Sequence, residues 1–321
     1  MQGWRSSSVL GVDGLEFVDL DLGPPDDRHL VVDVRAAALN FSDLLMSEDK
    51  YQVRPPRPFT PGQEIAGTVV SAPRGSHWNV GDRIASKIPW GGFAEQALVP
   101  CDSAFLIPEN FSFELAAALP VTYTTSMVAF FDSTKLRSDQ TVMVHAAAGG
   151  VGLAAVEIAK AIGARVIATA SNAHKLDIAR EHGADVCINY SDENWVEAVK
   201  GATSGLGVDV IYDPVGGDVS LQSLRCLARN GVILIVGFAS GTITEIPANR
   251  LMLKRASAKG VYWHHDHDAD LIKKMMDKMF VMLEKDLLKP LVDRRFDLAQ
   301  LPDAMRALQN RDTTGKVVLA V

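Results

Sequence analysis

One stretch of the sequence, residues 141–170, restricts the possible folds more than any other. It begins with a short run of β-branched and apolar residues, passes through a glycine-rich turn, and then carries apolar residues at helical spacing. Gly163 ends the expected helix, and a second β-branched run follows at 165–170. The order strand, glycine turn, helix, strand predicts a βαβ unit of a doubly wound α/β domain.

The glycine turn has the composition of a phosphate-binding loop. Its letters, AAGGVG over 147–152, place Ala147 at the first glycine of the usual G-x-G-x-x-G pattern and Gly149 and Gly152 at the other two. Glycines at this point let a phosphate reach the first N–H groups of the helix, where the helix dipole is positive. We therefore predict a dinucleotide site here rather than a plain tight turn.

The end of the second strand indicates which dinucleotide binds. A site for NAD usually has Asp or Glu about twenty residues after the glycines, bonded to the ribose. This chain instead has Ala170 and Ser171 there, with Lys175 following. A hydroxyl and an ammonium can bind a 2′-phosphate that a carboxylate would repel, so the sequence favours NADPH. The alternative for Lys175 is an ordinary solvated lysine on a helix surface.

Length and composition exclude several other classes of protein. The 321 residues are enough for two domains with their own cores. A net charge of −7 without a basic cluster argues against nucleic acid as a partner. Neither a signal-peptide core nor a bilayer-length apolar run is present, so we expect a cytoplasmic protein with no membrane partner. Cys101, Cys187 and Cys226 have neither disulfide-framework nor metal-site spacing.

Changes in sequence pattern divide the chain into three parts. Residues 1–120 carry short alternating runs broken by Pro, Gly and Asp, which is typical of a small bent β-barrel. Residues 121–262 repeat strand and helix patterns, which predicts a parallel sheet with helices on both faces. Residues 263–321 are expected to form a long helix at 269–284, a helix at 301–309 and an extended segment at 316–320. This part should return to the first domain, with the active site in the cleft between the domains. In the middle part we expect strands at 141–146, 165–169, 186–189, 208–212, 232–236 and 258–262, and helices at 151–162, 174–182, 195–200 and 220–228.

Ordered motifs along the chain resemble the medium-chain dehydrogenase/reductase superfamily, and more closely its zinc-free, zeta-crystallin-like NADPH:quinone oxidoreductase branch. They are LNFSDLL (39–45), KYQVRPPRPFTPGQEIAG (50–67), VGDRI (80–84), GGFAE (91–95), AAAGGVG (146–152), INY (188–190), DVIYDPVGG (209–217) and TGKVVL (314–319). The resemblance implies a GroES-like β-barrel catalytic domain, a Rossmann NADPH-binding domain and a homodimer.

The same resemblance argues against a metal. Zinc-dependent members of the superfamily carry a Cys where this chain has Asn40 and a His where it has Gln63. Asn and Gln are poor zinc ligands, and the four-cysteine lobe that holds structural zinc in those members is absent. We therefore expect a zinc-independent reductase with no metal site.

The resemblance also implies roles for individual residues. Those matching the pyrophosphate turn are Gly149, Gly150, Val151 and Gly152, and those matching the 2′-phosphate site are Ser171, Lys175, Tyr190 and Arg311. Phe238 and Ala239 match the segment beside the nicotinamide ring, and Asn40, Asp43 and Tyr51 match the pocket that lies next to it. Asn40 and Asp43 could position a carbonyl or the ribose, and the alternative for Asp43 is a helix cap.

Two classes of substrate fit these residues. A quinone needs little beyond a flat apolar slot, whereas an activated alkene, such as an enone or an enoyl-CoA, benefits from a proton donor. Tyr51 matches the tyrosine thought to donate a proton in mitochondrial-type enoyl reductases, and its phenol could act as a general acid. The alternative is that Tyr51 only shapes the pocket. A non-catalytic NADPH-binding protein, like the lens crystallins of this branch, is a third possibility.

The histidine-rich segment WHHDHD, residues 263–268, contains metal-ligand residue types. Neighbouring residues rarely converge on one ion, so we expect a polar cap for the long helix instead. The four methionines of that helix, at 275, 276, 279 and 282, have helical spacing and are expected to pack rather than to bind a cofactor.

Overall fold

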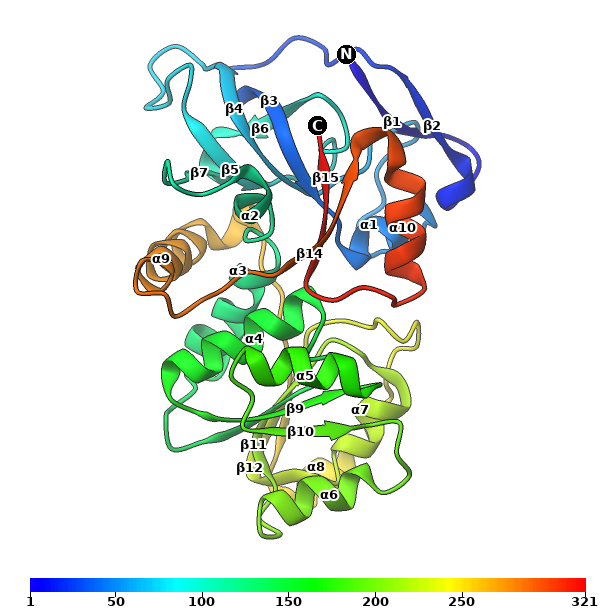
Figure 1. The fold of residues 1–321 in the computed structure, drawn as a ribbon, viewed down its shortest axis with the longest axis vertical. Helices are drawn as coiled ribbons and strands as arrows, with labels where there is room; N and C mark the ends of the chain where they lie inside the picture. Colours follow the sequence, from blue (N-terminus) through cyan, green and yellow to red (C-terminus); the bar gives the residue numbers. More distant parts are fainter. The chain divides into compact units, whose positions relative to one another are not determined.

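Two compact units make up the computed structural model, which describes all residues 1–321. Unit 1 combines residues 1–121 with 291–321, and unit 2 is residues 122–290. Figure 1 shows the blue N-terminal and red C-terminal segments within unit 1, whereas the green and yellow segments form unit 2.

The boundary at the C-terminal side differs from the one expected from the sequence. Residues 263–290, which we assigned to the segment returning to the first domain, cluster with unit 2. The reason is that α9 (His265–Glu284) packs on α3 (Thr122–Met127) through its buried methionines. The Thr124 hydroxyl, for example, lies 3.1 Å from the Met276 sulfur. The methionines are therefore core residues of unit 2.

Unit 1 is built on one large, mainly antiparallel sheet with the strand order β14-β15-β3-β4-β5-β7 and with β6 paired to β3. Its strands are β3 (His29–Ala38), β4 (Glu64–Ser71), β5 (Arg83–Lys87), β6 (Gln96–Pro100), β7 (Ala104–Leu106), β14 (Val292–Asp297) and β15 (Lys316–Ala320). A separate antiparallel hairpin joins β1 (Gln2–Ser6) to β2 (Leu15–Asp19). Because β14 and β15 come from the end of the chain, the C-terminal residues complete the sheet of the first domain.

The two sides of the unit 1 sheet differ in the size of their side chains. One side carries large residues such as Val32, Ile65 and Val99 in the main core. The other carries Ala36 and other small residues, against which α2 (Phe113–Ala117) packs closely. The remaining helices are α1 (Phe41–Ser47) and α10 (Leu301–Gln309), with short 3-10 turns at Val12–Gly14, Cys101–Ser103 and Leu298–Gln300.

Unit 2 contains a six-stranded parallel sheet with the order β10-β9-β8-β11-β12-β13. Its strands are β8 (Thr141–Val144), β9 (Arg165–Ala170), β10 (Val186–Asn189), β11 (Val208–Asp213), β12 (Leu227–Ile235) and β13 (Ser257–Gly260). The chain runs outward from β8 to β10 and then returns to the other side of β8. The sheet order therefore reverses between β8 and β11, which is where a dinucleotide binds in such folds.

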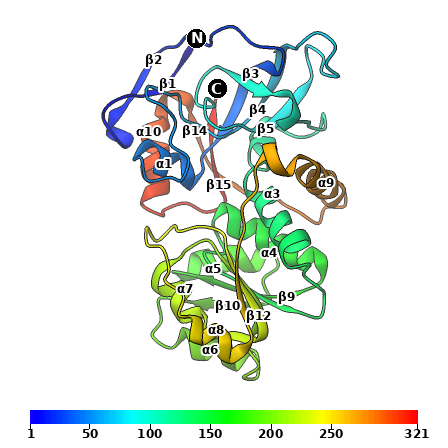
Figure 2. The same cartoon turned by 180° about the vertical axis from the view of Figure 1, so that it is seen from behind.

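Helices cover both faces of this sheet (Figures 1 and 2). On one side α4 (Gly150–Ile162) lies against β8 and β9, and α5 (Ala173–Glu181) lies against β9 and β10. On the other side α6 (Trp195–Ala202), α7 (Gly217–Ser223) and α8 (Ala248–Lys254) supply apolar residues to one core with the strands. Unit 2 also has a π-helical turn, Val128–Ser133, after α3. No helix of the structure combines the length and the apolar character that crossing a bilayer requires.

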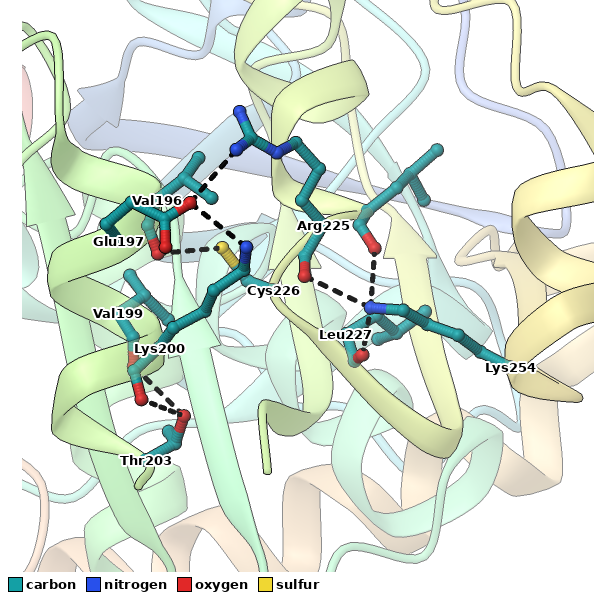
Figure 3. A network of polar contacts seen from close by, with 10 residues as sticks. Val196, Glu197, Val199, Lys200, Thr203, Arg225, Cys226, Leu227 and Lys254 are labelled. Carbon is teal, nitrogen blue, oxygen red and sulfur yellow. Dashed lines mark hydrogen bonds and ion pairs between the residues drawn. The ribbon is translucent and has the colours of Figure 1, made fainter. Parts of the chain in front are cut away.

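The prediction of a helix over 220–228 was wrong in its second half, because α7 ends at Ser223 and β12 begins at Leu227. The Lys254 ammonium stabilises the turn between them by donating to the carbonyl oxygens of Leu224 and Arg225, both at 3.1 Å, and to that of Leu227 (Figure 3). These carbonyls would otherwise lack partners where the helix stops. The sequence also did not indicate α8 or β14.

Candidate active site

The glycine turn at the start of α4 fits a phosphate. Gly149 is the N-cap residue, and no side chain caps this end of the helix. A Cβ at Gly152 would lie 2.3 Å from the Ala146 carbonyl oxygen, so only glycine allows the helix to start this close to the turn. The first N–H groups of a 13-residue helix, including those of Gly150 and Val151, are thus left for an anion.

Two of the predicted 2′-phosphate residues, Ser171 and Tyr190, lie near each other just after β9 and β10. The Tyr190 N–H donates to the Ala170 oxygen at 3.1 Å, and the Ser191 hydroxyl donates to the Ser171 oxygen at 3.3 Å. Lys175 lies in the first turn of α5, where its N–H is capped by Asn172 at 3.0 Å. No acidic side chain ends β9, so the position that bonds the ribose in NAD sites has no carboxylate to repel a 2′-phosphate.

Arg311 belongs to unit 1, in the turn after α10, with a left-handed φ of 60°. Its assignment to the 2′-phosphate, beside residues of unit 2, stays a prediction.

Two turns at the carboxyl ends of β11 and β12 are hydrogen-bonded to each other, and we call them the double turn (residues 213–217 and 237–242). The Ala239 N–H, for example, donates to the Pro214 oxygen at 3.0 Å. Phe238 and Ala239, the residues predicted beside the nicotinamide, are both partly buried in this double turn. The double turn lies next to the point where the strand order reverses, where the nicotinamide half of a dinucleotide is expected.

In unit 1, three of the polar side chains near α1 form a buried ion cluster: Lys316, Glu64 and Asn40. The Lys316 ammonium lies 2.7 Å from a Glu64 carboxylate oxygen, and both side chains are almost fully buried. The ammonium also donates to the Asn40 amide oxygen and to the Leu39 oxygen, both at 2.8 Å. The Asn40 amide nitrogen donates to Glu64 at 2.9 Å, and the other Glu64 oxygen accepts the Val121 N–H at 2.7 Å. The hydrogen bonds of the Asn40 side chain are therefore made to other groups of the protein.

Asp43 lies beside this cluster and is completely buried. Its Oδ2 accepts the Asn40 N–H at 2.8 Å, so Asp43 completes a capping box in which Asn40, and not Asp43 as considered from the sequence, is the N-cap of α1. Its Oδ1 is buried without a hydrogen-bond partner. Burial raises the pKa of Asp43 from 3.8 to about 7, against the opposing effects of the Asn40 N–H and the Lys316 ammonium. The carboxyl therefore keeps its proton to a much higher pH than an exposed Asp does.

Tyr51 lies in a bend shortly after α1 and is partly exposed. Asn40 and Asp43 are at the opposite, N-terminal end of the same short helix. The catalytic roles predicted for these three residues stay predictions.

The donors that stand where zinc ligands would be expected are occupied by other contacts. The Gln63 amide oxygen accepts the Ser42 hydroxyl, and the Asn40 amide is bonded within the buried ion cluster. No group of three or more His, Cys, Asp or Glu residues in the structure could hold a metal ion. In the histidine-rich segment, His264 is the N-cap of α9, and its ring accepts the Asp266 N–H at 3.3 Å. The expectation of a polar cap there is confirmed.

Sequence reasoning missed Glu64 and Lys316. A signal was available, because a lysine opens the otherwise apolar strand KVVLA and a glutamate opens EIAGTVV. A charged side chain at such a position must be paired when it is buried.

Known proteins share this combination of domains. Residues 26–109 match the family described as alcohol dehydrogenase GroES-like domain, and residues 150–280 match the family described as zinc-binding dehydrogenase. A Nematostella vectensis protein described as a quinone oxidoreductase-like protein 2 homolog is 42% identical, over 90% of this chain and 80% of its own length. The Pseudomonas aeruginosa quinone oxidoreductase is 33% identical over 96% of both chains. The crystal structure of Escherichia coli quinone oxidoreductase complexed with NADPH is 29% identical, covers 100% of both chains and gives a TM-score of 0.94. The predicted fold class, a GroES-like barrel with a Rossmann-type domain, is confirmed.

Proposed function

Because the chain belongs to the medium-chain dehydrogenase/reductase superfamily, in its zinc-free quinone oxidoreductase branch, we propose that it uses NADPH to reduce a quinone. The observation that carries the proposal is the uncapped glycine start of α4 together with a β9 end that has no acidic residue. The first feature suits a pyrophosphate and the second suits a 2′-phosphate. The E. coli relative, crystallised with NADPH, supports the same choice of cofactor.

Residues of the chain would hold NADPH at three places. The N–H groups at Gly150, Val151 and Gly152 would bind the pyrophosphate. The polar groups of Ser171, Lys175, Tyr190 and Arg311 would bind the 2′-phosphate. The double turn would hold the nicotinamide ring at the switch point of the sheet.

The bound cofactor supplies a hydride, and the protein orients the acceptor and controls access of protons. A quinone that takes one hydride and one proton becomes a hydroquinone, so the two-electron reduction needs no further reductant. Because a hydroquinone oxygen can take its proton from water, the chain needs no dedicated acid for this reaction. We further propose that the reaction is zinc-independent, since the Asn40 and Gln63 amides are poor zinc donors and are already bonded within the protein.

The alternative substrate is an activated alkene, and the basis for this alternative is a partly exposed tyrosine, Tyr51. Reduction of an enone or an enoyl-CoA places hydride on one carbon and a proton on the other, so Tyr51 would act as the general acid. The remaining alternative is a protein that binds NADPH without turning it over.

Steady-state oxidation of NADPH by the wild type and by Tyr51→Phe distinguishes these functions. The acceptors are 1,4-benzoquinone, 9,10-phenanthrenequinone, an enone and crotonyl-CoA at equal concentrations. Fast quinone turnover that survives the substitution supports the quinone reductase. Preference for an alkene, with a large loss of kcat on removing the phenol, would replace it with the alkene reductase. No oxidation with any acceptor, despite NADPH binding, would support the non-catalytic alternative.

A homodimer, which the resemblance to the family implies, and a cytoplasmic location complete the proposal. Light scattering coupled to size-exclusion chromatography should give about twice the chain mass of 34.7 kDa. A mass equal to one chain would exclude the dimer.

A further inference from the structure

Three polar side chains form a buried row at the carboxyl edge of the unit 2 sheet. The registers of β8 with β11 and with β9 place His145 between Asp213 and Thr169. The His145 N–H donates to the Tyr212 oxygen at 3.0 Å, which extends the ladder of β8 and β11 to this position. His145 and Thr169 are fully buried, and Asp213 is 1% exposed. The row lies where the strand order reverses, so a dinucleotide bound to this sheet would cross it.

The His145 ring is held between one polar neighbour and two aromatic ones. Its Nδ1 lies 2.7 Å from the Thr169 hydroxyl, whereas its Nε2 is buried and has no hydrogen-bond partner. The rings of Tyr190 and Trp195 contact it edge-on, with centroids at 6.4 and 5.8 Å. Burial lowers the pKa of His145, and the Asp213 carboxylate, the one charged group that acts on the ring, opposes this. The imidazole is therefore neutral at pH 7.

The Asp213 carboxylate connects this row to the double turn. Its Oδ1 accepts the Val215 N–H at 2.9 Å and the Gly216 N–H at 3.1 Å. The Val215 oxygen in turn accepts the N–H of Ser240 at 2.8 Å. A Cβ at Gly216 would lie 3.0 Å from the Phe238 ring, so the two halves of the double turn are in close contact. A displacement of the carboxylate would therefore change both halves.

We propose that His145 is a positioning residue for the nicotinamide half of NADPH. Its neutral ring fills the space beside Asp213 and keeps the carboxylate bonded to the Val215 and Gly216 N–H groups, which fixes the double turn. A charged ring would instead attract the carboxylate and compete with those N–H groups. The identity of the ligand rests on the proposed function, whereas the ordering of the double turn belongs to the protein alone.

The test is His145→Ala, which removes the ring from beside Asp213. His145→Phe keeps a neutral planar ring there and should behave like the wild type. Dissociation constants are measured by calorimetry for NADPH and for 2′,5′-ADP, which has the 2′-phosphate but no nicotinamide. In His145→Ala we expect NADPH binding to weaken about tenfold or more, and 2′,5′-ADP binding to change less than about twofold. In the protein without cofactor, hydrogen exchange at the Val215 and Gly216 amides should become faster. Thr169→Val is the matched control, because it removes the contact of Nδ1 and should leave those two amides protected.

An equal loss of affinity for both ligands would overturn the proposal, as would unchanged exchange at Val215 and Gly216 in His145→Ala. Equally fast exchange in Thr169→Val would also overturn it, because the effect would then be a general loosening of the strand ends. If the wild type does not bind NADPH, the proposed function fails, yet the exchange measurement still tests the role of His145. If His145→Ala does not fold, NMR titration of the wild-type imidazole decides: protonation clearly below the ordinary pKa of about 6.5 is expected, and protonation at that ordinary value refutes the proposal.

Discussion

Replacing Lys316 with methionine tests the buried ion cluster of unit 1. Methionine has similar length and keeps the apolar packing of the stem, but it removes the ammonium. Glu64 would then be a fully buried carboxylate without its cation, and the Leu39 and Asn40 oxygens would each lose the donor that now lies at 2.8 Å. The change therefore leaves one charge and two acceptors uncompensated.

The expected loss of stability is large. Breaking a buried ion pair by removing one partner costs about 3–5 kcal/mol. For a domain of this size, each kcal/mol lowers the melting temperature by roughly 2–4 °C, so we expect a decrease on the order of 10 °C.

Chemical denaturation followed by circular dichroism at pH 8 measures the loss of stability. The double variant Glu64→Gln/Lys316→Met removes the uncompensated charge and should recover most of the loss at pH 8. Arg5→Met is the matched control, because its ion pair with Glu16 is 40% and 51% exposed and should contribute little. A loss below about 1 kcal/mol in Lys316→Met would refute the reasoning. An equally unstable double variant would do the same.

Three further predictions follow from the two sites. Asp43→Asn should stabilise the protein at pH 8 relative to pH 5, by up to about 2.6 kcal/mol, because the pKa of Asp43 is raised from 3.8 to about 7 and the wild type loses stability as the pH rises between these two values. Thermal melts across this range check it, and parallel pH curves for variant and wild type would contradict it. Gly152→Ala should abolish NADPH binding, since its Cβ would lie 2.3 Å from the Ala146 oxygen, and fluorescence titration measures the loss; wild-type affinity would show that the turn can relax. Lys175→Met should weaken NADPH binding about tenfold while leaving NADH binding almost unchanged, and equal effects on both cofactors would exclude a contact to the 2′-phosphate.

The parts of the fold that could be predicted from the sequence are those fixed by local patterns. The bounds of β10, α10 and β15 agree with the expected ranges, because each has a clear periodicity next to turn residues. The strand β14 has the sequence VDRRFD, and its many charged residues do not suggest a strand that pairs with β15. The helix α7 was extended too far because its end is stabilised by Lys254, which lies thirty residues further along the chain. The sequence close to the end of α7 does not indicate such a distant contact.

The same distinction applies to the sites. The glycine turn of α4 depends on backbone geometry within a few residues, so its letters alone indicate a phosphate site. The buried ion cluster joins Glu64 to Lys316 across 252 residues of sequence, and only the fold brings them together. The row of His145, Thr169 and Asp213 likewise depends on the register of three strands. The sequence around these residues does not indicate which other residues they contact in the fold.

The central claim, a zinc-independent reductase specific for NADPH, is tested most directly by one comparison of kcat/KM. The protein is dialysed against EDTA, and the oxidation of NADPH and of NADH is followed with 9,10-phenanthrenequinone as acceptor. We predict that NADPH is preferred by about tenfold or more and that added zinc leaves the rate unchanged. A preference for NADH, or activity that returns only with zinc, would contradict the claim.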